Sequence, residues 1–267
     1  MDIKSSHLRA VEWLQLARNM DNSWGYLPGQ VGDGEPTLLA CAAGMRAPLD
    51  WLALNELHWS SLLLPATLSE KRLTPVLTEK FKRAMVVQRG RPMEENQAEN
   101  RLDGSLRGWA WVEGTFSWVE PTAYALISSR ILGDLKSKIV LEGRAMLLDR
   151  QCADGGWNYG NKEVLGRALG SDFRSTAWAV MALERSLFTD RAMTRLETVY
   201  RYPSANGLAL TILAGQCHSY RVEQGIEQLI QWQRADGSFS GRCDWTALAA
   251  CALNAAQNGG HHFANPA

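Results

Sequence analysis

Four acidic side chains stand just before apolar stretches of the chain and could do proton chemistry: Glu35, Glu120, Asp244 and Asp172. The first three lie two residues ahead of a threonine, and Asp172 opens the segment DFRSTA. A carboxyl group in apolar, tryptophan-rich surroundings resists ionisation, and the resulting raised pKa suits a general acid. We therefore predict these four as candidate catalytic residues. The alternative is structural, because an acidic residue at a helix start can cap free N–H groups and complement the helix dipole.

The densest aromatic cluster in the chain is GWAWVEGTFSWVEPT, residues 108–122. Aromatic faces can stabilise a cation or stack on a sugar ring. The alternative is a loop that apolar burial holds over the fold. We predict that substrate binding involves the aromatic side chains of this cluster and two residues of the later segment FRSTAWAVMAL, which together are Trp109, Trp111, Phe116, Trp118, Arg174 and Trp178.

Short repeats indicate which elements position these side chains. Residues 143–157 (GRAMLLDRQCADGGW) and 225–239 (GIEQLIQWQRADGSF) share Gly, Gln, Gly and an aromatic residue at the same spacing. Residues 10–24 form a degenerate third copy. Each copy is typical of an amphipathic helix that ends in a tight turn. We expect positive φ at Gly155 and Gly237, and we expect the Gln amide to satisfy free carbonyls at the turn.

A second, more apolar helix is predicted after each turn. Its start carries a threonine at a repeated position, namely Thr37, Thr122, Thr176 and Thr246. A helix that is apolar on nearly every side is buried on nearly every side. The pattern therefore predicts outer amphipathic helices that alternate with inner apolar ones, with a further pair at 189–201 and 204–217.

Length and composition are those of a globular protein, with 267 residues, 46% hydrophobic and 21% charged. Lys plus Arg and Asp plus Glu number 28 each, which argues against a nucleic-acid-binding protein. No apolar run approaches the roughly 18 residues of a membrane span. The first residues lack an apolar signal core, so we expect a cytoplasmic protein. We predict one repeat domain over residues 1–257, a long loop near 89–108, and a frayed tail over 258–267.

These residues resemble the prenyltransferase and squalene-oxidase repeat superfamily, which includes the squalene–hopene cyclases. The QW motif of that family ends in Gln followed by Gly-x-Trp. The copies that end at Trp157 and Phe239 match its Gln-x-x-x-Gly-x-aromatic core. The resemblance implies an all-α fold of the α/α toroid type, a barrel of helical hairpins with inner and outer helix rings around a central cavity.

The resemblance also implies chemistry that this chain matches only in part. Cyclases of the family protonate a polyprene with an Asp-x-Asp-Asp-Thr motif at the start of an inner helix. The segment closest in form, DFRSTA, has Arg174 where the protonating acid is expected. Protein prenyltransferase β-subunits hold zinc through Asp, Cys and His, but the expected Asp-x-Cys is absent. We predict no metal and no cofactor.

Three functions fit these observations. The first is a terpenoid cyclase- or prenyltransferase-type enzyme that acts on an apolar isoprenoid in the central cavity without an intact acid motif. The second is a non-catalytic helical-repeat module that binds a ligand or a protein. The third is a carbohydrate-active α/α toroid, because Trp and paired carboxylates also suit sugars. The expected partner is an apolar small molecule, and the sequence leaves open whether the chain is an enzyme.

Overall fold

The computed structural model describes residues 2–93 and 101–264, and these residues form an almost entirely helical fold. The all-α prediction is confirmed. The inner helices are α2 (Gly34–Ala42), α4 (Leu64–Thr67) with the preceding 3₁₀ helix η1 (His58–Leu63), α6 (Val119–Ile131), α8 (Phe173–Ala182), α10 (Ala205–Cys217) and α12 (Cys243–Asn258). The outer helices are α1 (Ile3–Leu16), α3 (Leu49–Leu54), α5 (Pro75–Val87), α7 (Lys138–Asp149), α9 (Leu187–Leu196) and α11 (Glu223–Gln231).

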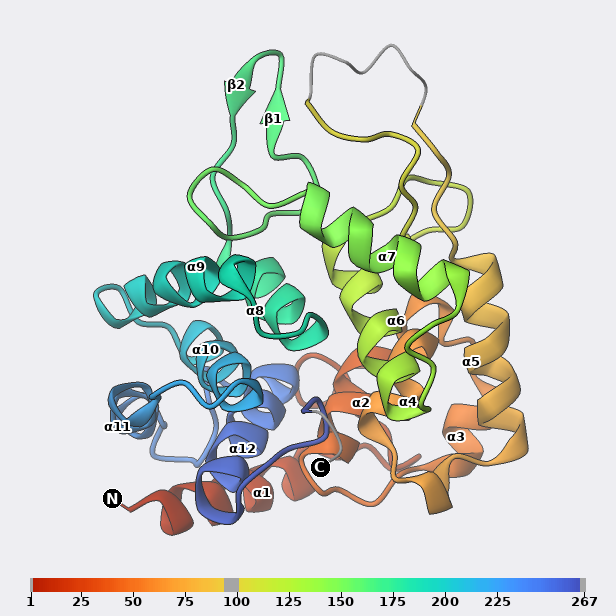
Figure 1. Ribbon diagram of the computed structural model, residues 1–267. Coiled ribbons are helices and arrows are strands. Elements are labelled where there is room, and N and C mark those ends of the chain that lie inside the picture. The colour runs from red at the N-terminus through yellow and green to blue at the C-terminus, as the bar shows by residue number, and fades with distance from the viewer. Residues whose placement is uncertain (1, 94–100, 265–267) are drawn as a thin grey trace.

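The inner helices contact one another in a closed cycle. In chain order, α4 and η1 contact α6, α6 contacts α8, α8 contacts α10, and α10 contacts α12. The cycle closes because α12 contacts α2, which in turn contacts η1 and α4 (Figure 1). Nearly every residue of α2, α6 and α10 is buried, as their uninterrupted apolar sequences predict. This cyclic order is what the α/α toroid prediction requires.

Outer helices cover this ring, most of them against an inner neighbour, whereas α3 contacts α5. Helix α1 packs on α12, α5 on η1, α7 on α6, α9 on α8 and α11 on α10 (Figure 1). The predicted pair at 189–201 and 204–217 is confirmed as α9, with the 3₁₀ helix η4 (Glu197–Tyr200), and α10. The 3₁₀ helix η2 (Glu70–Arg72) precedes α5. No helix within the described residues is long and apolar enough to cross a membrane.

One hydrogen-bonding device recurs at every turn that carries the repeat. The backbone N–H of an aromatic residue donates to the hydroxyl of an inner-helix threonine over 2.9–3.0 Å, in the pairs Trp24–Thr37, Trp109–Thr122, Trp157–Thr176 and Phe239–Thr246. Each of the three tryptophans also donates its indole N–H to a carbonyl of the preceding outer helix, at Leu14, Met85 or Leu147. The turn thereby fixes the start of the inner helix relative to the end of the outer one.

The repeated spacing of Gln and Gly gives a second set of hydrogen bonds in the two copies that end at Trp157 and Phe239. The side-chain amide of Gln151 donates to the carbonyl of Gly155 over 2.7 Å and to that of Phe188 over 2.8 Å. The amide of Gln233 donates in the same way to Gly237 and to Ser6. The predicted role of the Gln amide at the turn is confirmed. Each amide also reaches the start of the next outer helix, which joins neighbouring repeats.

Gly155 and Gly237 have φ of 92° and 95°, which confirms the predicted left-handed turns. A Cβ at Gly237 would meet the carbonyl oxygen of Arg9 at 2.6 Å, whereas at Gly155 the nearest atoms belong to Arg191 at 3.1 Å. We expect Gly155→Ala to lower the free energy of unfolding by about 1 kcal/mol, the usual cost of positive φ. Gly237→Ala should cost clearly more, because the Arg9 backbone oxygen at 2.6 Å would have to be displaced, whereas the Arg191 atoms at 3.1 Å need to give by only a few tenths of an ångström. Urea denaturation of both variants measures the difference, and equal costs would contradict this interpretation.

The periphery contains a short hairpin that the sequence did not predict and the described ends of the predicted long loop. Residues 163–168 form a short antiparallel hairpin, β1 (Glu163–Val164) and β2 (Arg167–Ala168), which projects from the helices at the top of Figure 1. The predicted long loop near 89–108 lies partly outside the described residues, since 94–100 are not among them. Its described ends are tied down by an isolated bridge between Arg89 and Trp109.

The C-terminal tail is packed, not frayed, where the structure describes it. The side chain of Phe263 is fully buried, and Arg130 donates to the Phe263 carbonyl over 2.6 Å. The prediction of a frayed tail is therefore wrong for residues 261–264, because an aromatic side chain there finds an apolar interior to fill. Residues 265–267 of that prediction lie outside the described part of the chain.

Candidate functional site

The starts of α2, α6 and α8 meet at one end of the ring through the side chain of Arg174. Its Nε donates to Glu120 over 2.7 Å, and its guanidinium also forms an ion pair with Glu35. A further N–H donates to the hydroxyl of Tyr124 over 3.1 Å. Three inner helices are thus joined by one cation and two carboxylates, which we call the rim clasp (Glu35, Glu120 and Arg174).

Both carboxylates of the rim clasp accept additional hydrogen bonds. Tyr124 donates its hydroxyl to Glu120 over 3.0 Å, and Ser175 donates to the other oxygen of Glu120 over 3.3 Å. Tyr26 donates to Glu35 over 2.7 Å. The two predicted acids therefore lie close together, and in each of these bonds the carboxyl oxygen is the acceptor.

Burial and the nearby arginines have opposite effects on the pKa of the acids at this end of the ring. Burial raises the pKa of Glu120, and the nearby Arg174 opposes that increase. Burial likewise raises the pKa of Asp244, against the pull of Arg242. Burial would lower the pKa of Arg174, but Tyr124 and the two carboxylates hold it well above its ordinary value. The guanidinium is permanently charged, so the clasp always contains a counter-ion for the acids.

The other two predicted acids lie beside the clasp in different roles. Asp244 forms a bidentate ion pair with Arg242, with distances of 3.0 and 2.9 Å, and Arg242 in turn lies over the rings of Tyr26 and Trp245. Asp172 is the N-cap of α8 and accepts from the backbone N–H of Ser175 over 2.7 Å. Its second oxygen is buried without a hydrogen-bond partner among the described residues.

The alternative reading of Glu35, Glu120 and Asp244 as N-caps is wrong. The capping positions of α2, α6 and α12 are Asp33, Trp118 and Arg242. The three acids lie inside the first turn, where their side chains point to arginines instead of the helix N–H groups. Only Asp172 among the four acids caps its helix through its side chain.

The predicted aromatic residues separate into two groups. Trp109 is fully buried in the repeated turn, Phe116 is 44% exposed, and Trp118 packs its ring edge against Tyr159. Trp111 and Trp178 instead lie edge-on to Tyr124, with ring centroids 6.0 and 4.7 Å away. Only the second group belongs to the ring interior.

A line of aromatic rings crosses that interior from η1 to the tail. Trp59 stacks on Tyr124 at 5.9 Å, Tyr124 contacts Trp178, and Trp178 contacts Phe263 at 5.2 Å. The first three rings come from inner helices, whereas Phe263 comes from the tail. We call the space that Phe263 fills the tail cavity.

His261 fixes the tail through both of its ring nitrogens. Nε2 lies 3.0 Å from the carbonyl of Leu213, and Nδ1 accepts from the backbone N–H of Phe263 over 3.2 Å. The neutral ring suits both bonds, because a proton on Nδ1 would face the Phe263 N–H. Burial, together with the neighbouring His262 and Arg130, lowers the pKa of His261 from 6.5 to about 4, against the opposing effect of the bond to the Leu213 carbonyl.

We expect the docked tail to loosen in acid. A histidine whose pKa is lowered on folding contributes stability that is present above its ordinary pKa and is lost as the pH falls toward the folded value. The transition should therefore lie between pH 6.5 and about 4. Limited proteolysis of the tail across this range measures it. A His261→Gln variant with the same pH profile as the natural chain would contradict the assignment to His261.

Within the described residues, no group of three or more His, Cys, Asp and Glu is arranged to hold a metal ion.

Several residues of this region were not among those predicted from the sequence: Tyr26, Tyr124, Arg242, Trp59 and Phe263. Tyr124 follows Glu120 by one helical turn, a spacing that could have indicated contact. The others come from a turn, a 3₁₀ helix and the tail, where no periodic signal exists.

Comparison with known proteins gives only distant likenesses. No family model matches the chain, and no curated protein matches it. Among solved structures, the type II terpene cyclase MstE from Scytonema is similar at a TM-score of 0.44 and 14% identity, over 96% of this chain and 98% of that one. A protein from Actinoplanes is similar at the same TM-score and identity, over 96% and 100% of the two chains. A complex of a MstE variant with geranylgeranyl dihydroxybenzoate has a TM-score of 0.38 at 12% identity, over 94% and 96%.

Proposed function

We propose that this chain binds an apolar, isoprenoid-type small molecule in the interior of its helical ring and does not protonate it. One observation carries the proposal: Phe263, a residue of the tail and not of any ring helix, fills an aromatic-walled space inside the ring. An apolar ligand that displaces the tail would meet the rings of Trp178 and Tyr124. Such a tail acts as a built-in occupant that a ligand must outcompete.

The chemistry of the walls favours an apolar ligand. Tyr124 and Trp178 are fully buried, and Met181 of α8 and Leu213 of α10 are fully buried apolar residues of the same core. The indole N–H of Trp178 is buried and has no hydrogen-bond partner within residues 2–93 and 101–264, so a single ligand oxygen could satisfy it. These features suit a branched hydrocarbon chain that ends in a hydroxyl or carbonyl group.

The rim clasp argues against acid-initiated cyclisation. A general acid must present its proton to the substrate within hydrogen-bond reach. The oxygens of Glu35 and Glu120 instead face Arg174, Tyr26, Tyr124 and Ser175. The raised pKa of Glu120 favours a second candidate function, protonation of the bound isoprenoid. That candidate requires the clasp to open first.

Incubation of the intact chain with farnesol tests both functions together. We expect saturable binding by equilibrium dialysis, and we expect gas chromatography with mass spectrometry to recover farnesol unchanged. A cyclised or isomerised product that disappears in Glu120→Gln would establish the second candidate and reject the first. Absence of saturable binding would reject the isoprenoid ligand altogether.

A further inference from the structure

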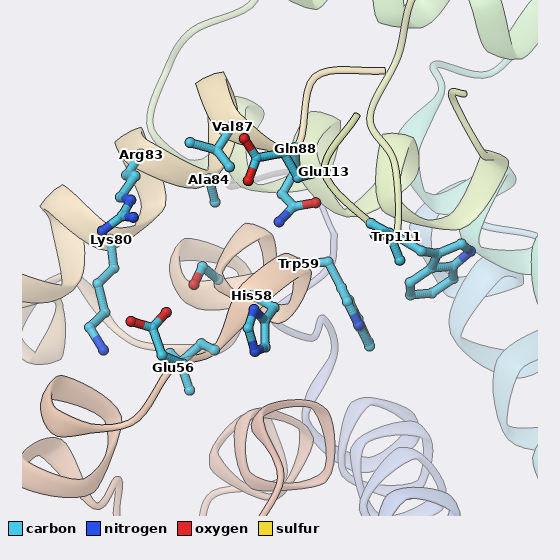
Figure 2. A pocket seen from close by; sticks show the side chains of 13 residues that line it. Glu56, His58, Trp59, Lys80, Arg83, Ala84, Val87, Gln88, Trp111 and Glu113 are labelled. Atoms are coloured by element: carbon cyan, nitrogen blue, oxygen red, sulfur yellow. The ribbon is translucent and has the colours of Figure 1, made fainter. Parts of the chain in front are cut away.

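An open cleft of about 680 Å³ lies outside the tail cavity, between η1, α5 and the segment 111–113. Its wall includes Trp59 and Trp111, whose rings meet edge to face at 4.4 Å. Figure 2 shows the indole of Trp59 edge-on between His58 and Trp111, so that one indole face is turned to the side of the cleft where His58 lies. The opposite side of Trp59 is engaged with Trp111 and Tyr124.

Gln88 places an unpartnered polar group in the same cleft. Its side chain is 6% exposed, and its Oε1 is buried without a hydrogen-bond donor among the described residues. Gln88 is held in place by its backbone, which ends α5 and accepts from the N–H of Ala110 over 2.8 Å. Buried amide oxygens are nearly always paired in proteins, so an orphan that lines a cleft indicates a missing donor.

The backbone of His58 is unusual at this point. Its φ of 45° lies in the left-handed region, which residues with a side chain rarely adopt. The exposed imidazole projects into the cleft beside Trp59 (Figure 2). Strained backbone of this kind concentrates at ligand-binding positions.

The charges that line the cleft balance one another. Glu56 and Glu113 provide two carboxylates, and Lys80 and Arg83 provide two cations. The Lys80 ammonium donates to the carbonyls of Leu52 and Asn55 over 3.0 and 2.6 Å, so it is occupied at the end of α3. Such a lining has no excess charge with which to select an anion or a cation.

We infer that this cleft binds a neutral carbohydrate. A sugar ring offers an apolar face to Trp59 and hydroxyl groups that both donate and accept. Those hydroxyls complement the Gln88 amide, the His58 ring and the two carboxylates. The site lies on the outer side of Trp59, away from Phe263, and does not depend on the isoprenoid proposal.

Titration of the full chain with cellobiose, maltose and N,N′-diacetylchitobiose, followed by saturation-transfer NMR, tests the assignment. We expect saturable binding of at least one of these disaccharides. Gln88→Met should weaken that binding at least about tenfold without lowering the melting temperature, because it removes a buried unpaired oxygen. Trp111→Ala should weaken it as well, whereas Trp232→Ala, at a half-exposed indole on the end of α11, should leave it unchanged.

Three results would overturn the inference. They are no saturable binding of any of the three sugars, equal affinity of Gln88→Met and the natural chain, and tighter binding of glucose 6-phosphate than of the neutral sugars. Phe263→Ala should not change sugar affinity. This control separates the cleft from the tail cavity, so that either proposal can fail without the other.

Discussion

Replacement of Arg174 by methionine is expected to lower the free energy of unfolding by about 3–5 kcal/mol at neutral pH. The substitution keeps an unbranched side chain but leaves Glu35 and Glu120, 5% and 6% exposed, without their shared counter-ion. Uncompensated carboxylates in a buried site must either ionise at high cost or take up a proton. Urea denaturation at several pH values measures the effect.

The stability lost in Arg174→Met should depend on pH in a defined direction. Burial already raises the pKa of Glu120 above its ordinary 4.5, and removal of the cation raises it further. An acid whose pKa is raised on folding contributes stability that is present below its ordinary pKa and is lost as the pH rises through the folded value. The cost of Arg174→Met should therefore be largest at neutral pH and should shrink in acid.

Two control variants make the Arg174 result specific. Adding Glu35→Gln and Glu120→Gln to Arg174→Met should recover most of the stability, because the buried charges are then gone. Arg185→Met removes an exposed ion pair with Asp190, whose side chains are 58% and 45% exposed, and should cost at most about 1 kcal/mol. A cost for Arg174→Met as small as that for Arg185→Met would show that the rim clasp does not hold the ring together.

Phe263→Ala is expected to have opposite effects on stability and on ligand binding. Removal of the fully buried phenyl ring of the tail should lower the free energy of unfolding by about 1.5–3 kcal/mol. The same ring competes with the ligand for the tail cavity. Its loss should therefore tighten farnesol binding by about 10- to 150-fold, the same free energy expressed as affinity.

Phe239→Ala is the matched control, because Phe239 is equally buried but sits in the repeated turn before α12. Phe239→Ala should lower the free energy of unfolding by about 3–5 kcal/mol, because the turn around Phe239 stays in the core and a cavity remains there. Farnesol affinity should stay unchanged. Equal tightening in both variants would mean that any core cavity takes up farnesol, which would contradict a specific site at Phe263.

The repeats made much of the fold predictable. Glycine at 155 and 237, glutamine at 151 and 233, and the four threonines each correspond to a defined hydrogen bond or backbone conformation. The copy at Trp109 makes the same bonds and was missed. Asp103 and Arg107 stand where the other copies have Gln and Gly, and the interposed loop separates the turn from α5.

Part of the candidate site was predictable, but the pairing of its charges was not. Glu35, Glu120 and Arg174 each stand two residues before a repeated threonine at the start of an inner helix, and the structure brings them together. Their mutual pairing depends on the distance across the ring, which no local spacing encodes. The burial of Phe263 was not predictable for the same reason, because its partners Trp178 and Arg130 are distant in the sequence.

Fluorine NMR of the chain labelled with 4-fluorophenylalanine tests most directly whether a ligand takes the place of Phe263. The Phe263 resonance is assigned by its loss in Phe263→Leu. In the free chain it should report a buried ring, and saturating farnesol should convert it to the position of a solvent-exposed ring, with half-conversion at the dissociation constant from dialysis. Saturable farnesol binding that leaves the Phe263 resonance unchanged would contradict the proposed site.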